Sequence, residues 1–345
     1  MTLTQTLGST FKASLKSLTC AAGLALGLAQ GAAAADYVLK VSAPIPPTEK
    51  DVVYAWMVAF EKGVEESSGG RIDVQLYPAN QLGQLPAAIE GVAMGTIEVT
   101  FSIIGFFSSI DPRFQVLDAG GLFPTAEVAM STLQKPEVRE MLTGFGANAG
   151  VQPLTVLIDG QGVIISKEPI EAMVDFIGKK VRSGGATPLL NEPLQAVGAA
   201  PVAMSLGEVL PALQTGTIDA ATNSMGVVNA FKMYDAAKNV TYLPGNYTTV
   251  GAVINKDFLA MIGPELGQIV YDEAHKAEAV VARHLANAEK LDAAWEANGG
   301  RVIRMSPSEV KTYLTTIAPV VSKIVGQSAQ MQADYDLLET AAKAE

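Results

Sequence analysis

Histidine and cysteine do much of the nucleophilic, acid–base and metal chemistry of proteins, and this chain has very few of them. Its two histidines, His275 and His284, lie nine residues apart in one stretch with helical periodicity. That spacing places them on different helix faces, unlike the three- or four-residue spacing of a helical metal pair. We therefore expect two surface residues and no bound metal.

The motifs of the common enzyme classes are also missing from the sequence. It contains no G-x-S-x-G nucleophile elbow and no phosphate-binding P-loop. Gly144 and Gly146 begin a dinucleotide fingerprint, but Ala149 stands where its third glycine is needed. Hydrolase, kinase and dehydrogenase functions each lack an essential part. We expect no catalytic residues, no cofactor and no enzymatic activity.

The composition argues against two further classes of protein. Hydrophobic residues make up 49% of the chain, enough to build packed cores, which excludes a disordered protein. The formal net charge is -11 at pH 7, and no segment gathers lysine and arginine. A nucleic-acid partner requires clustered cations that neutralise phosphates, so we expect no nucleic acid as partner. The length predicts roughly two domains.

The N-terminal segment 1–35 has the pattern of a secretory signal peptide. Two lysines are its only charges, an apolar stretch follows at 18–28, and an A-x-A cleavage site ends the segment. The apolar stretch is too short for a permanent membrane span. Cys20, the single cysteine, follows a poor lipoprotein box, so lipid attachment is the less favoured alternative. We expect cleavage before Asp36 and a periplasmic protein without disulfides.

After residue 35 the hydrophobic pattern alternates between short strands and amphipathic helices, which favours parallel sheets in an α/β fold. The first region has expected strands at 37–42, 71–77 and 98–102 and helices at 52–66 and 85–93. The second has expected strands at 180–182, 200–203 and 217–221 and helices at 189–196 and 206–214. A long helix at 264–295 should cross between two lobes, and helices at 307–325 and 327–342 follow it.

One short pattern occurs in both regions. GTIE at 95–98 and GTID at 216–219 each end a helix with glycine and begin a strand with β-branched residues. The recurrence suggests two lobes of related architecture, with chance similarity as the alternative. Two α/β lobes, an export signal and no catalytic motif describe a binding protein that closes around a small ligand held between its lobes.

Five segments carry a resemblance to a known family. They are LYPANQLG at 76–83, GTIE at 95–98, GKKVR at 178–182, VGAAPV at 197–202 and EVLPALQTGTID at 208–219. In this order and spacing they resemble the DctP-type solute-binding proteins of tripartite ATP-independent periplasmic (TRAP) transporters. The resemblance implies capture of an organic acid in the periplasm and delivery to the membrane subunits of a sodium-driven permease.

The resemblance also implies a fold and a principal ligand contact. The fold is that of a two-lobe periplasmic binding protein, with lobe I at 36–159 and 248–287 and lobe II at 160–247 and 288–345. The family's signature arginine falls at Arg182, where a guanidinium can donate two parallel hydrogen bonds to a ligand carboxylate. Without the motif, an arginine after two lysines is more simply a solvated strand end.

Two further polar positions match the family. Asn223 follows the strand expected at 217–221, where its amide can donate to and accept from a ligand. Its alternative role is that of a helix N-cap. Glu208 opens a helix, where a carboxylate is stabilised by the helix dipole, so its alternative role is to support the fold alone.

The chain departs from the family at positions that bear on the ligand. Many members carry a second arginine where this chain has Gly162 after Gln161, and an aromatic residue where it has Leu206. The missing second cation points to a mono-anion, a carboxylate or a sulfonate, against partly apolar walls. Further candidate ligand-binding residues are Gln161, Leu206, Ile104, Phe106, Trp56 and Tyr247, although the apolar ones also fit a hydrophobic core.

Two other functions remain open at this stage. The same cleft would serve a ligand-sensing subunit that presents its closed form to a membrane sensor kinase, and genomic adjacency would separate the two. A periplasmic enzyme is the third possibility, but it would need turnover without histidine, cysteine or metal chemistry.

Overall fold

The computed structural model describes residues 35–344, so the signal peptide predicted at 1–35, with Cys20, lies outside the described residues except for Ala35. The strands are β1 (Tyr37–Ser42), β2 (Ile72–Tyr77), β3 (Val99–Ile103), β4 (Val151–Ser166), β5 (Lys180–Ser183), β6 (Ala200–Ala203), β7 (Ala220–Ser224), β8 (Asn239–Asn255) and β9 (Arg301–Arg304). The helices are α1 (Val52–Ser67), α2 (Leu85–Ala93), α3 (Ala126–Gln134), α4 (Pro136–Thr143), α5 (Pro188–Ala196), α6 (Leu206–Thr215), α7 (Met225–Ala230), α8 (Lys256–Ala277), α9 (Ala279–Leu285), α10 (Ala288–Ala297), α11 (Pro307–Val325) and α12 (Ala329–Lys343). Two 3-10 segments, η1 (Ile104–Ser109) and η2 (Pro112–Asp118), follow β3.

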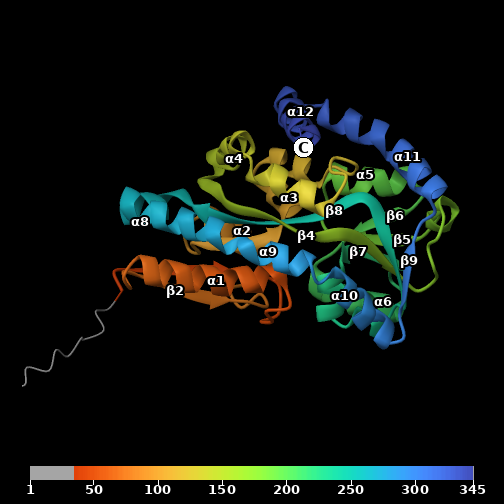
Figure 1. Ribbon diagram of the computed structural model, residues 1–345, viewed down its shortest axis with the longest axis horizontal. Coiled ribbons are helices and arrows are strands. Elements are labelled where there is room, and N and C mark those ends of the chain that lie inside the picture. The colour runs from red at the N-terminus through yellow and green to blue at the C-terminus, as the bar shows by residue number, and fades with distance from the viewer. Residues whose placement is uncertain (1–34, 345) are drawn as a thin grey trace, which may run out of the picture. The chain divides into compact units, whose positions relative to one another are not determined.

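The strands of the described residues form one mixed sheet with helices on its faces (Figure 1). Their order is β2-β1-β3-β8-β4-β7-β5-β6, with β9 beside β8. The sets β2-β1-β3 and β6-β5-β7 are parallel, as the alternating pattern predicted. The long strands β4 and β8 are antiparallel to each other and join the two sets. The α/β fold is confirmed, but the sequence analysis did not predict β4 and β8.

The recurring glycine pattern has the same backbone structure in both sets. Gly95 before β3 has a φ of 74°, and Gly216 before β7 has a φ of 78°, a conformation that favours glycine. After Gly95, two successive N–H groups donate to the carbonyl of Gly91, and after Gly216 two donate to that of Ala212. This turn occupies residues 217–219, so the strand expected at 217–221 begins only at Ala220.

The acidic residue that ends the pattern also has the same role twice. Glu98 Oε2 accepts the backbone N–H of Lys40 in β1 at 2.8 Å. Asp219 Oδ2 accepts that of Lys180 in β5 at 2.8 Å. Each carboxylate thus joins the entry of the third strand to the first strand of its set. The repeated sequence reflects a repeated structure.

Three hydrophobic cores hold the sheet and its helices. The first core packs around β1, β2 and β3 and includes α1, α2 and α8. In the second half, Val163 and Ile165 of β4 face the second core, and Ile164 between them faces the third. Because neighbouring strand residues point to opposite faces, the second and third cores lie on opposite sides of the sheet.

The helical stretch expected at 264–295 crosses between cores, but it is not one helix. Gly263, with φ 79° and ψ 169°, interrupts α8 immediately before Pro264, and breaks at 278 and 286–287 separate α8, α9 and α10. A residue before proline is sterically driven out of the helical region. Val270 of α8 packs in the first core and Trp295 of α10 in the second. The predicted single helix was wrong, but the three helices that replace it pass from the first core to the second.

The C-terminal helices cross between cores as well. Tyr313 near the start of α11 packs in the third core, and Ile324 near its end packs in the first. Helix α12 then continues over α3 and α4 with Leu338 in the first core (Figure 1). The two halves are therefore connected by β4, β8, α8–α10 and α11.

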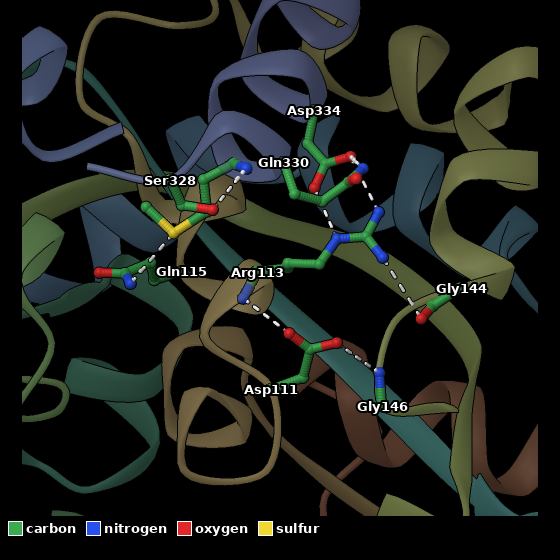
Figure 2. A network of polar contacts seen from close by, with 9 residues as sticks. Asp111, Arg113, Gln115, Gly144, Gly146, Ser328, Gln330 and Asp334 are labelled. Carbon is green, nitrogen blue, oxygen red and sulfur yellow. Dashed lines mark hydrogen bonds and ion pairs between the residues drawn. The ribbon is translucent and has the colours of Figure 1, made fainter. Parts of the chain in front are cut away.

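An ion pair fixes α12 to the first half (Figure 2). Arg113 of η2 donates from Nε and Nη2 to both carboxylate oxygens of Asp334 at 2.7 and 2.9 Å. Its guanidinium lies over the Phe145 ring, 4.3 Å from the centroid. Asp111 holds the segment by accepting the N–H groups of Arg113 and Gly146 at 3.0 and 2.9 Å.

Replacement of Arg113 should destabilise the protein strongly, because Asp334 would be left buried without its cation. We expect Arg113→Ala to lower the free energy of unfolding by roughly 3 kcal/mol, measured by urea denaturation. The control is Lys343→Ala, which breaks an exposed pair with Glu339 and should cost under about 1 kcal/mol. Equal losses in the two variants would contradict the assignment.

Candidate functional site

A cleft of about 500 Å³ lies where the carboxyl ends of both parallel strand sets meet. Its walls come from the loops after β1 and β2, from β3 and η1, and from the ends of β5, β6 and β7. Open α/β sheets bind ligands at this edge, because loops and helix N-termini converge there. The cleft is the strongest candidate for a ligand site in the described part of the chain.

Arg182 lies at the end of β5 and lines this cleft. Only 1% of the residue is exposed, so the expectation of a solvated strand end is wrong. Its Nε donates to the carbonyl of Met204 at 3.1 Å and its Nη1 to that of Thr222 at 3.2 Å. Within residues 35–344 no carboxylate pairs with it, and burial lowers its pKa to about 10. Its other N–H groups can therefore serve an anion in the cleft.

Asn223 lies at the end of β7 and lines the same cleft, 5% exposed. Its Oδ1 accepts the backbone N–H of Ser224 at 2.9 Å, which fixes the amide. Ser224, and not Asn223, is the N-cap of α7, since its hydroxyl accepts the N–H of Val227. The alternative role of Asn223 as a helix cap is thus wrong.

Two of the predicted apolar residues line the cleft. Leu206 opens α6 and Phe106 lies in η1, from opposite halves of the sheet. Near Leu206, the carboxylate of Glu208 accepts two hydrogen bonds from Ser205. The backbone N–H of Ser205 donates at 3.0 Å and the Ser205 hydroxyl donates at 2.6 Å. This is a capping box, so Glu208 supports the fold, and these bonds lower its pKa.

The other four predicted residues do not line the cleft. Trp56 is fully buried in the first core, where its ring packs against Phe101, and Ile104 is 1% exposed in the same core. Gln161 and Tyr247 line a second cavity of about 1040 Å³. The Gln161 amide donates to Leu243, and the Tyr247 hydroxyl to Pro124. An aromatic or aliphatic side chain on one face of a helix or strand does not by itself distinguish core from cleft.

The sequence analysis missed several polar residues that line the cleft, four of which bear on its chemistry. Asn80 follows β2, in a segment that carries the family resemblance, and Ser102 lies in an apolar run of β3. The Ser102 hydroxyl is buried and has no hydrogen-bond partner among the described residues. Asp51 and Asp159 are the cleft's two carboxyl groups, both at most 3% exposed. The only sequence signal for Asp51 is its position before a helix, which indicates a cap.

His284 is not the surface residue that we expected. Its side chain is 10% exposed, and Nε2 lies 3.4 Å from Oδ1 of Asp159. Burial is the largest single influence on the pKa of His284 and lowers it. The interactions with Asp159 and Asp51 together outweigh burial, so the pKa is raised. His275, by contrast, has a pKa lowered to about 4 by burial and by Arg139. The two histidines do lie apart, on different cavities.

The described residues offer no metal centre and no membrane span. No group of three or more His, Cys, Asp or Glu side chains within 35–344 is placed to hold a metal ion. Among the helices of that range, none combines the length and apolar character needed to cross a bilayer.

Comparison with known proteins finds similarity to periplasmic solute-binding proteins. The family "Bacterial extracellular solute-binding protein, family 7" (DctP) matches residues 46–328. The ectoine-binding periplasmic protein TeaA of Halomonas elongata is 28% identical over 292 residues, 82% of this chain and 83% of TeaA. The C4-dicarboxylate-binding periplasmic protein DctP of Rhodobacter capsulatus is 28% identical over 71% of this chain and 72% of its own.

The fold is shared with a solved structure. The periplasmic ectoine-binding protein of the TeaABC TRAP-transporter of Halomonas elongata superposes with a TM-score of 0.84 at 25% identity. The match covers 89% of this chain and all of that one.

A smaller pocket of about 70 Å³ borders the cleft and contains a buried carboxyl group. Asp118 lies there, and its Oδ2 has no hydrogen-bond partner among the described residues. Burial raises the pKa of Asp118 well above its ordinary value, and a bond from the Gly105 N–H offsets only part of this. The folded protein therefore holds a proton that the unfolded chain releases near pH 4.

Because the folded state binds this proton and the unfolded state does not, stability should fall as the pH rises from the unfolded to the folded pKa of Asp118. Asp118→Asn removes this titration. As the pH rises, the free energy of unfolding of the variant should therefore increase relative to that of wild type, by up to about 1.4 kcal/mol per pH unit. Thermal denaturation of both proteins from pH 5 to pH 8 measures this. Asp36→Asn, at an exposed carboxylate, is the control. A constant difference between Asp118→Asn and wild type would contradict the prediction.

Proposed function

The chain belongs to the bacterial extracellular solute-binding proteins of family 7, and on that premise we propose that it is a periplasmic receptor for a small organic anion with one carboxylate. It delivers this ligand to the membrane subunits of a TRAP transporter. The sequence of 1–35, with its signal-peptide pattern, supports the periplasmic location. Relatives that are named for ectoine and for C4-dicarboxylates support a small organic ligand.

The observation that carries the proposal is the burial of Arg182 without a counter-charge. A guanidinium removed from water loses solvation that two backbone carbonyls replace only in part. A ligand carboxylate restores the balance, because it matches the planar guanidinium with two parallel hydrogen bonds. Asn223 lies on the adjacent strand end and can bind the same ligand through its amide.

The charges in the cleft favour one carboxylate over two. Arg182 is the only lysine or arginine among the residues that line it within the described range. A second carboxylate would find no cation and would face Asp51 and Asp159 in the same cleft. A sulfonate in place of the carboxylate would satisfy the same arginine, and the screen described below separates the two.

The placement of the site supports closure of two lobes over the ligand. Arg182 and Asn223 belong to the second strand set, and Ser102 and Phe106 to the first, so a ligand between them bridges both halves. The predicted lobes, 36–159 with 248–287 and 160–247 with 288–345, remain a prediction. The packing of α12 on the first core favours moving that helix to lobe I.

Receptor function also agrees with the chemistry of the lining. Within the described residues the cleft is lined by no histidine and no cysteine. Its polar groups are amides, hydroxyls, two carboxyls and one guanidinium, which suit recognition. Binding and release, without turnover, are therefore the activity that we propose.

A thermal-shift screen of residues 36–345 against carboxylates, sugar acids, sulfonates and amino acids tests the proposal. A ligand at ~100-fold its dissociation constant should add about 2.7 kcal/mol of stability. Arg182→Ala should weaken binding of that ligand by about 2–5 kcal/mol, or roughly 30-fold or more in Kd, by calorimetry.

Arg71→Ala, at an exposed arginine outside the cleft, is the matched control and should bind as wild type does. Arg182→Lys keeps the charge but loses the paired geometry, so an intermediate Kd is expected. An unchanged Kd in Arg182→Ala would refute the assignment of this residue. A shift only with sulfonates would change the ligand class.

A further inference from the structure

The cleft that contains Arg182 also contains a buried carboxyl group of opposite charge. Asp51 lies at the N-terminus of α1, in the first half, and is 2% exposed. Both side chains line the same cavity of about 500 Å³. Among the ion pairs of the described residues, none joins Asp51 to Arg182. The cleft thus presents one positive and one negative group that a single small ligand can reach.

One carboxylate oxygen of Asp51 is free to bind a ligand. Oδ1 caps α1 by accepting the N–H groups of Val53 and Tyr54 at 2.9 and 3.2 Å. Oδ2 has no hydrogen bond to any described residue. Capping of the helix therefore accounts for only half of this carboxylate.

The neighbouring groups do not supply the missing counter-charge. Asp159 is nearby and also negative, but its own oxygens face the Ser224 hydroxyl and His284. Burial and the charge of Asp159 raise the pKa of Asp51 to about 7, against the weaker effects of its two N–H bonds and His284. Asp51 is therefore the acidic group in the cleft that still lacks a partner.

A metal ion is a poor candidate for this partner. No group of three or more metal-binding side chains is assembled within residues 35–344. The surrounding wall is instead partly apolar, with Phe101, Ile103 and Phe106 among its residues. The orphaned Ser102 hydroxyl lies in the same wall and can accept one more hydrogen bond. A nitrogen cation that carries N–H donors suits these acceptors and these apolar surfaces.

We propose that the ligand is a zwitterion, whose carboxylate binds Arg182 and whose protonated nitrogen, an ammonium or amidinium, binds Oδ2 of Asp51. This inference rests on the proposed function, since it assumes that Arg182 binds a carboxylate. It narrows the ligand class from organic anions in general to amino acids, imino acids and cyclic amidine carboxylates.

Matched pairs of ligands that differ only in the nitrogen test the proposal. L-proline is paired with cyclopentanecarboxylate and pipecolate with cyclohexanecarboxylate, and ectoine is added as an amidinium zwitterion. For a pair whose members bind residues 36–345, calorimetry should give the zwitterion a Kd at least 10-fold lower than that of the matching plain carboxylate. In Asp51→Asn that ratio should fall to about 2-fold or less. Asparagine is as good an N-cap as aspartate, so the helix should be retained.

The matched control is Asp111→Asn, at an aspartate that also accepts backbone N–H groups but lies outside the cleft. This variant should keep the wild-type ratio, and the melting temperature of each variant reports on its folding. Asp51→Ser, which also caps a helix, provides a second variant in case the first fails to fold.

The outcomes separate this inference from the proposed function. A wild-type protein that binds the plain carboxylates as tightly as the zwitterions, with loss in Arg182→Ala, would refute the zwitterion and keep the receptor. An undiminished ratio in Asp51→Asn would refute the role of Asp51. In another outcome, plain carboxylates bind more tightly in sodium buffer than in sodium-free buffer, and the difference is lost in Asp51→Asn. That result would refute the ligand nitrogen and identify a metal cation as the partner of Asp51. Failure of every carboxylate to bind would refute the proposed function itself.

Discussion

The burial of one guanidinium constrains much of this structure. Arg182 is 1% exposed, and a charge so far from water must be held by polar groups. The carbonyls of Met204 and Thr222 lie beyond β6 and within β7, the two strands beside β5. The strand order β6-β5-β7 therefore supplies both acceptors without any carboxylate. Arg182 also lines the cleft, where its remaining N–H donors are available to the anion that we propose.

The repeated strand set explains how two distant parts of the chain meet at that cleft. Each set has the order of a first strand between the second and the third, and each uses a positive-φ glycine and a carboxylate to join strand three to strand one. Parallel strands bring their carboxyl ends to one edge. Because β8 and β4 lie between the sets and are antiparallel to their neighbours, both edges open on the same space. The crossing strands and helices can then carry a motion of one half against the other.

The acidic character of the protein does not oppose the binding of a carboxylate. The net charge of -11 belongs mostly to solvated side chains, whose fields are screened over about 10 Å in salt solution. Inside the cleft, individual buried charges dominate, because they are screened much less. Arg182 on one half and Asp51 on the other give the cleft a polarity that neither half has alone.

The sequence by itself determined what depends on local pattern. Strand 37–42 and helices 85–93 and 307–325 follow from periodicity, and the order of short motifs led to Arg182. Periodicity was insufficient for β4 and β8, whose register is broken by bulges, and for the helix at 264–295, which breaks at 278 and 286–287 divide. Only the tertiary structure placed Trp56 in the core, His284 beside Asp159, and Asp51 in the cleft. A tryptophan on a helix or an aspartate before one has the same local pattern in a core, a cap or a binding site. Its role is decided by which distant elements pack against it.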